Sequence, residues 1–373
     1  MIKTIKVRLR PTASQEQKLW QSAGVSRFAY NWAVAFEENN CKNGGTFIDD
    51  CELRRKFTEL KRQPEYEWLY NTSNNITKQA IKDACNAYKK FFKGQAGKPK
   101  FKSKRKTEPS FYNDPIKLKY KNERFLIEKV GWVRISEPER ITVTKFSNPH
   151  IKYDGKYWYI SVGVEAEKPV VELSGASLGI DVGIKDLAIC SDKYKAKNIN
   201  KSKKTKKHTK KLRRLQRKVS RKYQNNKKGN KFVKTSNIVK LEKKIKLVNR
   251  KIANIRLNHI HQATAAIVKT KPSRVVMESL NIQGMMKNRH LSKAIGEQGL
   301  YSFKSILKYK CDFYGIEFVE ADRFYPSSKK CVVCGNIKKD LKLSDRTYKC
   351  LVCGNVIDRD YQAALNLSKY QIS

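Results

Sequence analysis

The chain opens with an alternating pattern and then becomes helical. Residues Ile2 to Arg10 alternate apolar with basic or polar side chains, which predicts a strand, and Pro11 ends it. From Ser14 to about Phe92 apolar residues recur at spacings of three and four, so we expect an α-helical segment. A basic linker with an embedded aromatic residue, Pro99 to Lys106, follows it.

Short strand-like runs dominate the next region, from Tyr112 to Glu165. These runs are rich in β-branched and aromatic residues, and turn formers separate them, which is typical of a small antiparallel barrel. The strand at Ile2 to Arg10 can complete this barrel across the helical segment, and two separate sheets are the alternative. Three later runs have the pattern of buried strands: Leu178–Gly183, Arg274–Leu280 and Ile316–Val319.

The segment from Lys201 to Lys251 is the most basic part of the chain. It holds 23 Lys or Arg and a single acid, Glu242. Apolar residues at heptad-like spacing predict two helices that pack as a hairpin around a turn at residues 225–230. A solvated helix pair is the ordinary interpretation of such a charge run. Because acids that could pair within the helices are nearly absent, we favour contact with phosphates.

The overall charge strengthens this interpretation. Among 373 residues, 81 are Lys or Arg and 34 are Asp or Glu, so the formal net charge is +47. So many positive charges repel one another in a compact state, so a polyanion that neutralises them is the natural partner. This charge excludes most ordinary metabolic enzymes and makes nucleic acid the leading candidate. A hydrophobic fraction of 39% argues against a disordered basic tail. The length allows two or three folded domains.

The sequence has no stretch typical of a membrane span or a signal peptide. No run of 18 apolar residues occurs, and the alternating start differs from the apolar core of a signal peptide. We therefore expect a cytoplasmic protein without membrane contact.

Four of the nine cysteines form two Cys-x-x-Cys pairs, Cys331 with Cys334 and Cys350 with Cys353. Fifteen residues separate the pairs, and a Gly follows each. Four thiolates are the set that tetrahedral Zn²⁺ prefers, and they leave no open position for a substrate, so we predict one structural zinc ion. Four free buried cysteines are the alternative. The clustering indicates a reducing compartment, and seven surrounding Lys and Arg suit a nucleic-acid clamp.

Three acids far apart in the sequence lie where a carboxylate is costly. Asp181 and Glu278 lie in or at the end of apolar strands, and Asp360 lies at a predicted helix start. Each has an ordinary interpretation: Asp181 can cap a turn, Glu278 can pair with Arg274, and Asp360 can suit the helix dipole. Together they fit a carboxylate set that holds two Mg²⁺ ions about 4 Å apart for phosphodiester hydrolysis.

Several stretches resemble the TnpB family, the transposon-encoded RNA-guided nucleases related to type V CRISPR effectors. The matching stretches are Gly179–Gly183, Met277–Leu280, Ser327–Gly335 and Asp358–Ala364, with further similarity at Leu9–Thr12, Phe101–Lys104 and Leu212–Lys218. The resemblance therefore spans nearly the whole chain.

The resemblance implies an α+β multidomain fold. A small β-barrel, the wedge, would be split by a helical recognition domain, and a RuvC-like nuclease domain of RNase H fold with an inserted zinc ribbon would follow. The implied boundaries are 1–10 and 107–172 for the wedge, 11–106 for the recognition domain, 173–326 for the nuclease domain with the basic hairpin at 201–268, 327–355 for the zinc ribbon and 356–373 for a last nuclease segment.

The resemblance also implies a function. Such a protein binds a guide RNA transcribed from the transposon end (omega RNA), recognises a short motif beside the target and cuts double-stranded DNA. We expect a monomer in a prokaryotic cytoplasm, associated with the nucleoid when DNA is bound, that requires no protein partner and contacts no membrane. Asp181, Glu278 and Asp360 match the family's catalytic acids and would hold Mg²⁺. Gln362 departs from the usual Asn, which puts a hydrogen bond near the third acid in doubt.

Candidate nucleic-acid contacts come from the same resemblance and from the basic segments. Asn75, Lys78 and Gln79 resemble the family's DNA-contacting stretch, with an ordinary exposed polar face as the alternative. The basic candidates are Lys102, Lys104, Arg213, Arg214 and Arg217. Two other functions stay open: a guided DNA-binding protein with a weakened nuclease site, and a transposase that joins DNA strands.

Overall fold

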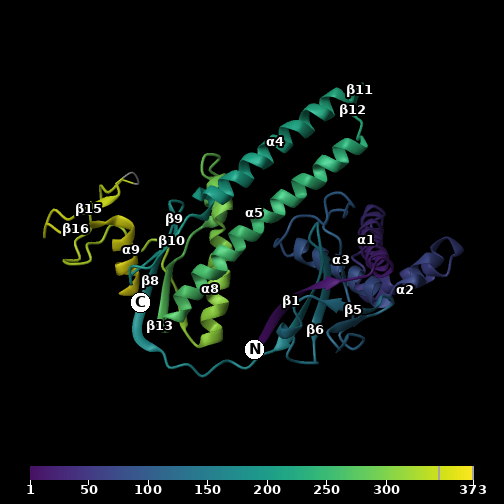
Figure 1. Ribbon diagram of the computed structural model, residues 1–373, viewed down its shortest axis with the longest axis horizontal. Helices are drawn as coiled ribbons and strands as arrows, with labels where there is room; N and C mark the ends of the chain where they lie inside the picture. The colour runs from purple at the N-terminus through teal and green to yellow at the C-terminus, as the bar shows by residue number, and fades with distance from the viewer. Residues whose placement is uncertain (343–344, 372–373) are drawn as a thin grey trace. The chain divides into compact units, whose positions relative to one another are not determined.

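The computed structural model describes residues 1–342 and 345–371. The chain forms two compact units, Met1–Ala166 and Glu167–Ser373, and each has its own hydrophobic core (Figure 1). No helix within the described ranges combines the length and the apolar character needed to cross a membrane.

A seven-stranded antiparallel sheet organises the first unit. Its strand order is β2-β6-β7-β1-β5-β4-β3. The strand predicted at the start of the chain is present as β1, which pairs with β7 from Ile2 opposite Glu165 and with β5 at Leu9 opposite Ile135. The bounds are β1 Ile2–Arg10, β2 Ser110–Tyr112, β3 Lys119–Lys121, β4 Arg124–Ile127, β5 Gly131–Ile135, β6 Ser147–Tyr153 and β7 Trp158–Glu165, with a 3₁₀ turn at Pro138–Arg140.

Helices fill the segment between β1 and β2, as the apolar spacing predicts. Thr12 and Gln15 form a capping box that starts the first helix directly after the proline. The first and third helices pack against each other, and their apolar faces join the core of the sheet. The bounds are α1 Ala13–Lys42, α2 Asp50–Lys61, a 3₁₀ helix at Pro64–Asn71 and α3 Asn74–Phe92.

The second unit contains a five-stranded sheet with the order β10-β9-β8-β13-β14. The first three strands are antiparallel neighbours, whereas β8, β13 and β14 run parallel. This order and these directions are those of the RNase H fold. All three predicted buried strands are present. The bounds are β8 Ser174–Val182, β9 Asp186–Cys190, β10 Lys195–Lys197, β13 Pro272–Glu278 and β14 Glu317–Ala321.

Helices cover both faces of this sheet. On one face, the second half of α5 and α8 pack on apolar residues of β8 and β13. On the other face lies α9, so the sheet separates α9 from α8 (Figure 1). The bounds are α4 Lys203–Asn225, α5 Ser236–Lys269, α6 Ile282–Met286, α7 Ser292–Gln298, α8 Leu300–Tyr314 and α9 Arg359–Ser368, with a 3₁₀ turn at Ile199–Lys201.

Two smaller features project from this core. The predicted basic hairpin is present: α4 packs along α5, and a two-stranded turn, β11 (Lys227–Lys228) with β12 (Lys231–Phe232), joins them. The four paired cysteines lie in a ribbon that contains β15 (Thr347–Lys349) and β16 (Val356–Asp358).

Candidate functional site

Asp181 faces α9 because side chains alternate along β8. Leu178, Ile180 and Val182 point into the core beneath α5 and α8, so Gly179 and Asp181 lie on the opposite face. A Cβ at residue 179 would lie 2.0 Å from the carbonyl oxygen of Ala364 and 2.3 Å from the backbone nitrogen of Ser368. Only glycine therefore lets α9 rest directly on β8. This close approach brings the start of α9 near Asp181.

Glu278 reaches the same edge of the sheet from β13. This strand runs parallel to β8 with Met277 opposite Ile180, so the register continues to Glu278 beside Asp181. The hydroxyl of Ser327 donates a hydrogen bond of 3.1 Å to Glu278 Oε1.

The ordinary interpretation of Glu278 as a partner of Arg274 is wrong. The Arg274 side chain lies 3.5 Å from the carboxylate of Glu317 instead, and it donates a hydrogen bond to the carbonyl of Tyr370. Among the described residues, no basic side chain makes an ion pair with Glu278.

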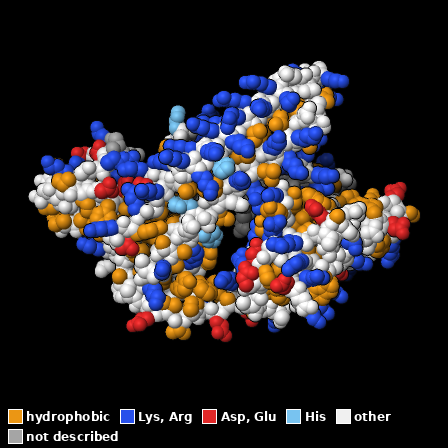
Figure 2. Space-filling view, in the orientation of Figure 1, with side chains coloured by type: hydrophobic (Ala, Val, Ile, Leu, Met, Phe, Trp, Pro, Cys, Tyr) orange, Lys and Arg blue, Asp and Glu red, His pale blue; other side chains and the backbone are white. Residues whose placement is uncertain are grey.

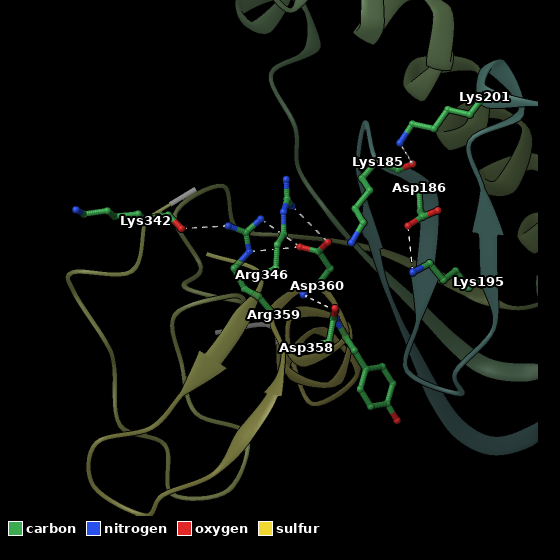
Figure 3. A network of polar contacts seen from close by, with 10 residues as sticks. Lys185, Asp186, Lys195, Lys201, Lys342, Arg346, Asp358, Arg359 and Asp360 are labelled. Atoms are coloured by element: carbon green, nitrogen blue, oxygen red, sulfur yellow. Dashed lines mark hydrogen bonds and ion pairs between the residues drawn. The ribbon is translucent and has the colours of Figure 1, made fainter. Parts of the chain in front are cut away.

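The carboxylate of Asp360 does not cap α9, because Asp358 takes that role. Asp358 Oδ1 accepts hydrogen bonds of 3.0 Å from the backbone N–H groups of Asp360 and Tyr361. The Asp360 carboxylate pairs instead with Arg359 at 3.2 Å and with Arg346 of the cysteine ribbon at 3.9 Å. Figure 3 shows both guanidinium groups pointing toward this carboxylate.

The three carboxylates repel one another. Burial, and then the negative charges of Glu278 and Asp360, raise the pKa of Asp181 well above its usual value, while Arg359 opposes this shift. Burial also raises the pKa of Glu278, against the hydrogen bond from Ser327. A group of acids held in this way is stabilised by a counter-charge, and a divalent cation supplies the most compact one.

The donor set fits Mg²⁺ in its chemistry, since three carboxylates offer hard oxygen ligands. The carboxylates are not drawn together as tightly as the cysteines. Within residues 1–342 and 345–371, the cysteines form the only group of three or more candidate ligands whose donor atoms all lie within 4.8 Å of one another. In this arrangement the two arginines neutralise Asp360.

The four cysteine thiols fit a zinc ion. Cys331 Sγ lies 3.6 Å from Cys353 Sγ, and Cys334 Sγ lies 3.5 Å from Cys350 Sγ. Tetrahedral Zn²⁺ with bonds of about 2.3 Å requires sulfur atoms about 3.8 Å apart. The backbone N–H of Cys353 lowers the pKa of the Cys350 thiol to about 6, against the effect of burial, so this sulfur is prepared to be a thiolate ligand.

Amide side chains of α9 connect the ribbon to the acids. Asn366 Nδ2 donates hydrogen bonds of 2.7 Å to the carbonyl of Ser327 and 2.6 Å to that of Lys330. Gln362, which departs from the family pattern, donates one of 3.3 Å to the carbonyl of Ser328, and its buried Oε1 has no partner among the described residues. Both amides thus hold the loop whose Ser327 contacts Glu278.

Two of the candidate DNA contacts in the first unit are already engaged. Asn75 Nδ2 donates a hydrogen bond to Glu128 at 3.2 Å, and Gln79 Nε2 donates one to Asp83 at 2.8 Å. Lys78 is exposed on the same helix.

The basic candidates also divide into engaged and available side chains. The Lys102 ammonium lies 3.6 Å from the ring centroid of Tyr30, and burial lowers its pKa. Lys104 is exposed. Three arginines of α4 are exposed and form no ion pair with any residue in the described ranges: Arg213, Arg214 and Arg217. Figure 2 shows basic side chains gathered over α4 and α5.

Sequence reasoning missed three residues of the acidic site. Arg346 and Arg359 pair with Asp360, and Ser327 contacts Glu278. Arg359 could have been suspected from its position between Asp358 and Asp360. Arg346 lies in a ribbon rich in Lys and Arg, so no local signal separates it from its neighbours.

Comparisons with known proteins cover the whole chain. Residues 159–289 match the family described as "Probable transposase", residues 301–367 match "Cas12f1-like, TNB domain", and residues 1–46 match "Helix-turn-helix domain". The solved structure titled "Cryo-EM structure of the Cas12f1-sgRNA-target DNA complex" superposes with a TM-score of 0.57 at 16% identity, covering 99% of this chain and 98% of the other. This likeness concerns the fold.

Two relatives carry names that state an activity. "Putative RNA-guided DNA endonuclease" from Streptomyces pristinaespiralis is 28% identical over 98% of this chain and 88% of its own length. "Putative RNA-guided DNA endonuclease InsQ" from Escherichia coli strain K12 is 30% identical over 98% of this chain and 91% of its own length. With identity at this level over nearly the full length of both chains, this protein belongs to the TnpB family of RNA-guided DNA endonucleases.

Proposed function

We propose that this chain binds a guide RNA transcribed from a transposon end, the omega RNA, recognises a short motif beside its target and cuts the target DNA. The observation that carries the proposal is the convergence of Asp181, Glu278 and Asp360 at one edge of the nuclease sheet. The named activity of the relatives and the guide RNA and target DNA in the Cas12f1 structure support it.

The three acids are the proposed ligands of two Mg²⁺ ions. Ions held there would supply an activated water and charge stabilisation for the leaving 3′ oxygen. Ser327 orients Glu278 through its hydrogen bond, so this carboxylate is positioned before any ion arrives. Arg346 and Arg359 neutralise Asp360 meanwhile. With a cation held by Asp360, the guanidinium of Arg346 would be able to contact a phosphate of the DNA.

One Zn²⁺ ion held by the four cysteines is proposed to be structural. The ion would close the ribbon that carries Arg346, and the hydrogen bonds of Asn366 join the start of this ribbon to α9. The ion would therefore stabilise the positions of both Arg346 and the loop at Ser327.

Base pairing with the guide RNA would read the DNA sequence, while the protein grips the nucleic-acid backbone. The exposed arginines of α4 and the linker residue Lys104 are the proposed phosphate contacts. Lys78 is the proposed contact on α3, because Asn75 and Gln79 must first release Glu128 and Asp83. A single copy of the chain carries the complete acid set, so we propose that it works as a monomer.

The direct test compares cleavage by the parent protein and by Asp181→Ala, each loaded with its transposon-end RNA. We expect the parent to cut DNA that carries the target and the adjacent motif, and Asp181→Ala to bind RNA equally well without cutting. The matched control is Asp312→Asn, which removes an exposed acid that pairs with Lys168. Cleavage by Asp181→Ala at the parent rate would refute the site, and strand joining without RNA would favour a transposase.

A further inference from the structure

A cleft of about 500 Å³ is lined by Glu278 and by residues of the segment that follows β13. Its volume lies in the range of small-molecule sites. The lining combines apolar and polar side chains: Leu280, Met285 and Leu291 with Asn281, Asn288 and Arg323. None of these side chains takes part in the acid site described above.

Exposed Phe324 stands at the same edge of the sheet. Glu278 lies opposite Ala321 in the parallel pairing of β13 with β14, so the segment that follows Ala321 begins level with the cleft. Phe324 is 85% exposed, and the guanidinium of Arg323 lies 5.8 Å from its ring centroid. An exposed ring beside a guanidinium group offers a face on which a nucleobase can stack, with a cation nearby for its phosphate.

The loop that carries Phe324 is held in place. The backbone N–H of Phe324 donates a hydrogen bond of 2.7 Å to Asp322 Oδ1. The next residue, Tyr325, donates its hydroxyl to the carbonyl of Asn366 at 3.1 Å, and its ring packs against that of Tyr370 with centroids 4.9 Å apart. The exposed ring is therefore presented by a structured loop.

The polar side chains of the cleft are oriented as donors. Asn281 Oδ1 accepts a hydrogen bond of 2.9 Å from the backbone of Gly284, and Asn288 Oδ1 accepts one of 3.0 Å from that of His290. Neither Nδ2 group makes a hydrogen bond to any residue within 1–342 or 345–371. Each amide thus turns its oxygen toward the protein and keeps its N–H₂ for another acceptor, such as the edge of a nucleobase.

We propose that this cleft together with Phe324 forms a subsite for one unpaired nucleotide of the DNA strand that is being cut. The Phe324 ring stacks on the base, the two asparagine amides contact its edge, and Arg323 contacts a phosphate beside it. The inference rests on the proposed nuclease function and names a substrate feature of the same site.

Stacking explains why the nucleotide must be unpaired. A base inside a duplex already has a neighbour on each face, whereas an unpaired base offers a free face to an aromatic side chain. Pairing of a guide with one DNA strand leaves the other strand unpaired. The subsite would therefore hold a displaced strand next to the acids and disfavour an intact duplex.

The first experiment measures stacking without cleavage. Guide-loaded Asp181→Ala is bound to target DNA in which 2-aminopurine replaces one base at a time across the cut site. We expect one position to show strong fluorescence quenching, which Asp181→Ala/Phe324→Ala loses and Asp181→Ala/Phe324→Trp keeps. Replacing Tyr301, which is 67% exposed on α8, by Ala in the same background is the matched control and should keep the quenching. Equal quenching with and without Phe324 overturns the proposal.

The second experiment separates stacking from a structural role by using an abasic nucleotide at the quenched position. Loss of one stacked base is worth about 10-fold in binding, so we expect the parent to lose about 10-fold in kcat/KM on the abasic target. Phe324→Ala should lose about 10-fold on normal DNA and nothing more on abasic DNA. If Phe324→Ala also cuts the abasic target about 10-fold more slowly than the parent cuts it, the role of Phe324 is structural and the subsite is refuted. A parent that cuts neither target refutes the nuclease function itself.

Discussion

At the scale of single residues, Asp181 is under the greatest electrostatic strain in the acid site. Burial and the charges of Glu278 and Asp360 raise its pKa. A carboxylate in an unfolded chain has a pKa of about 3.9. The folded protein therefore binds this proton more tightly than the unfolded chain does. Without a metal ion, stability is lost as the pH rises from the unfolded pKa through the raised pKa of the folded state.

We therefore predict that Asp181→Asn stabilises the metal-free protein. At neutral pH the melting temperature in EDTA should rise by about 2–4 °C, and this gain should vanish below about pH 4, where the wild-type acid is also neutral. Mg²⁺ should stabilise the wild type more than the variant. Calorimetry over this pH range checks both effects. Asp192→Asn, in an exposed turn, is the control, and a neutral-pH loss in Asp181→Asn would contradict the prediction.

Gly179 lets α9 pack close to β8, and this packing brings Asp360 near Asp181. We predict that Gly179→Ala lowers the free energy of unfolding by about 1–3 kcal/mol and reduces cleavage, because its methyl group would collide with the backbone of α9 at Ala364. Gly175→Ala lies on the same strand, where a Cβ meets nothing within 4 Å, and it should be nearly neutral. Denaturant titration measures the difference. Equal stability of the two variants would show that α9 does not depend on this contact.

At the scale of elements, the cysteine ribbon and α9 act on the acid site together. The ribbon carries Arg346, and Asn366 of α9 holds both ends of the segment from Ser327 to Lys330, which directly precedes the first cysteine. Disorder in the ribbon is thus transmitted to Glu278 through Ser327.

Removal of the zinc ion should therefore impair cleavage from outside the acid site. We predict that Cys350→Ser lowers the zinc content from about one ion per chain to almost none and reduces the cleavage rate at least about 10-fold, in line with the loss of a structural metal ligand. Metal analysis and cleavage assays check this. Cys41→Ser, at an exposed cysteine far from the ribbon in sequence, should change neither the zinc content nor the cleavage rate. Cleavage at the parent rate by a zinc-free variant would show that the acid site does not depend on the cysteine ribbon.

The hairpin of α4 and α5 has a large excess of positive charge: from Lys201 to Lys251 it holds 23 Lys or Arg and one acid, Glu242, which pairs with Lys234. We predict that replacing Arg213, Arg214 and Arg217 by Gln lowers the slope of log affinity for RNA against log salt by up to about 2–3, since each phosphate contact contributes roughly 0.7–0.9. Filter binding over a salt series measures the slope.

Lysines that already have an acidic partner provide the control for this test. Lys168 pairs with Asp312 at 2.7 Å, and Lys195 pairs with Asp186 at 3.1 Å. Their replacement by Gln should leave the slope nearly unchanged. A slope that is equally insensitive to the arginines of α4 would assign the hairpin to the solvated surfaces.

At the scale of the whole molecule, the excess charge is divided unequally between the two units. Residues Met1–Ala166 carry 33 Lys or Arg and 18 acids, a net charge of +15, whereas Glu167–Ser373 carry 48 and 16, a net charge of +32. About two thirds of the excess thus lies in the unit that contains the acid site. The acid site therefore lies within a positive field, which attracts the DNA phosphates.

Features with a local cause could be predicted from the sequence. The alternation of apolar and polar residues in a strand, and the spacing of apolar residues by three and four in a helix, involve only residues close in sequence. The strand β1, the helices between β1 and β2 and the basic hairpin were therefore predicted correctly. The spacing within each Cys-x-x-Cys pair likewise indicates a metal ligand set, and the structure brings all four thiols together. The three acids were identified as one set by their type and by the family resemblance.

The tertiary structure alone decided how these parts meet. Asp181 and Glu278 lie 97 residues apart in sequence, and they become neighbours only because β13 pairs with β8. Long-range contacts also pair Arg346 with Asp360 and Glu128 with Asn75. The pattern of residues along the sequence does not predict these contacts. The sequence by itself therefore determined the elements, the charge and the ligand types, because these follow from short-range chemistry. Which side chains share a site was decided by long-range packing, since the order of strands and the approach of α9 at Gly179 set those distances.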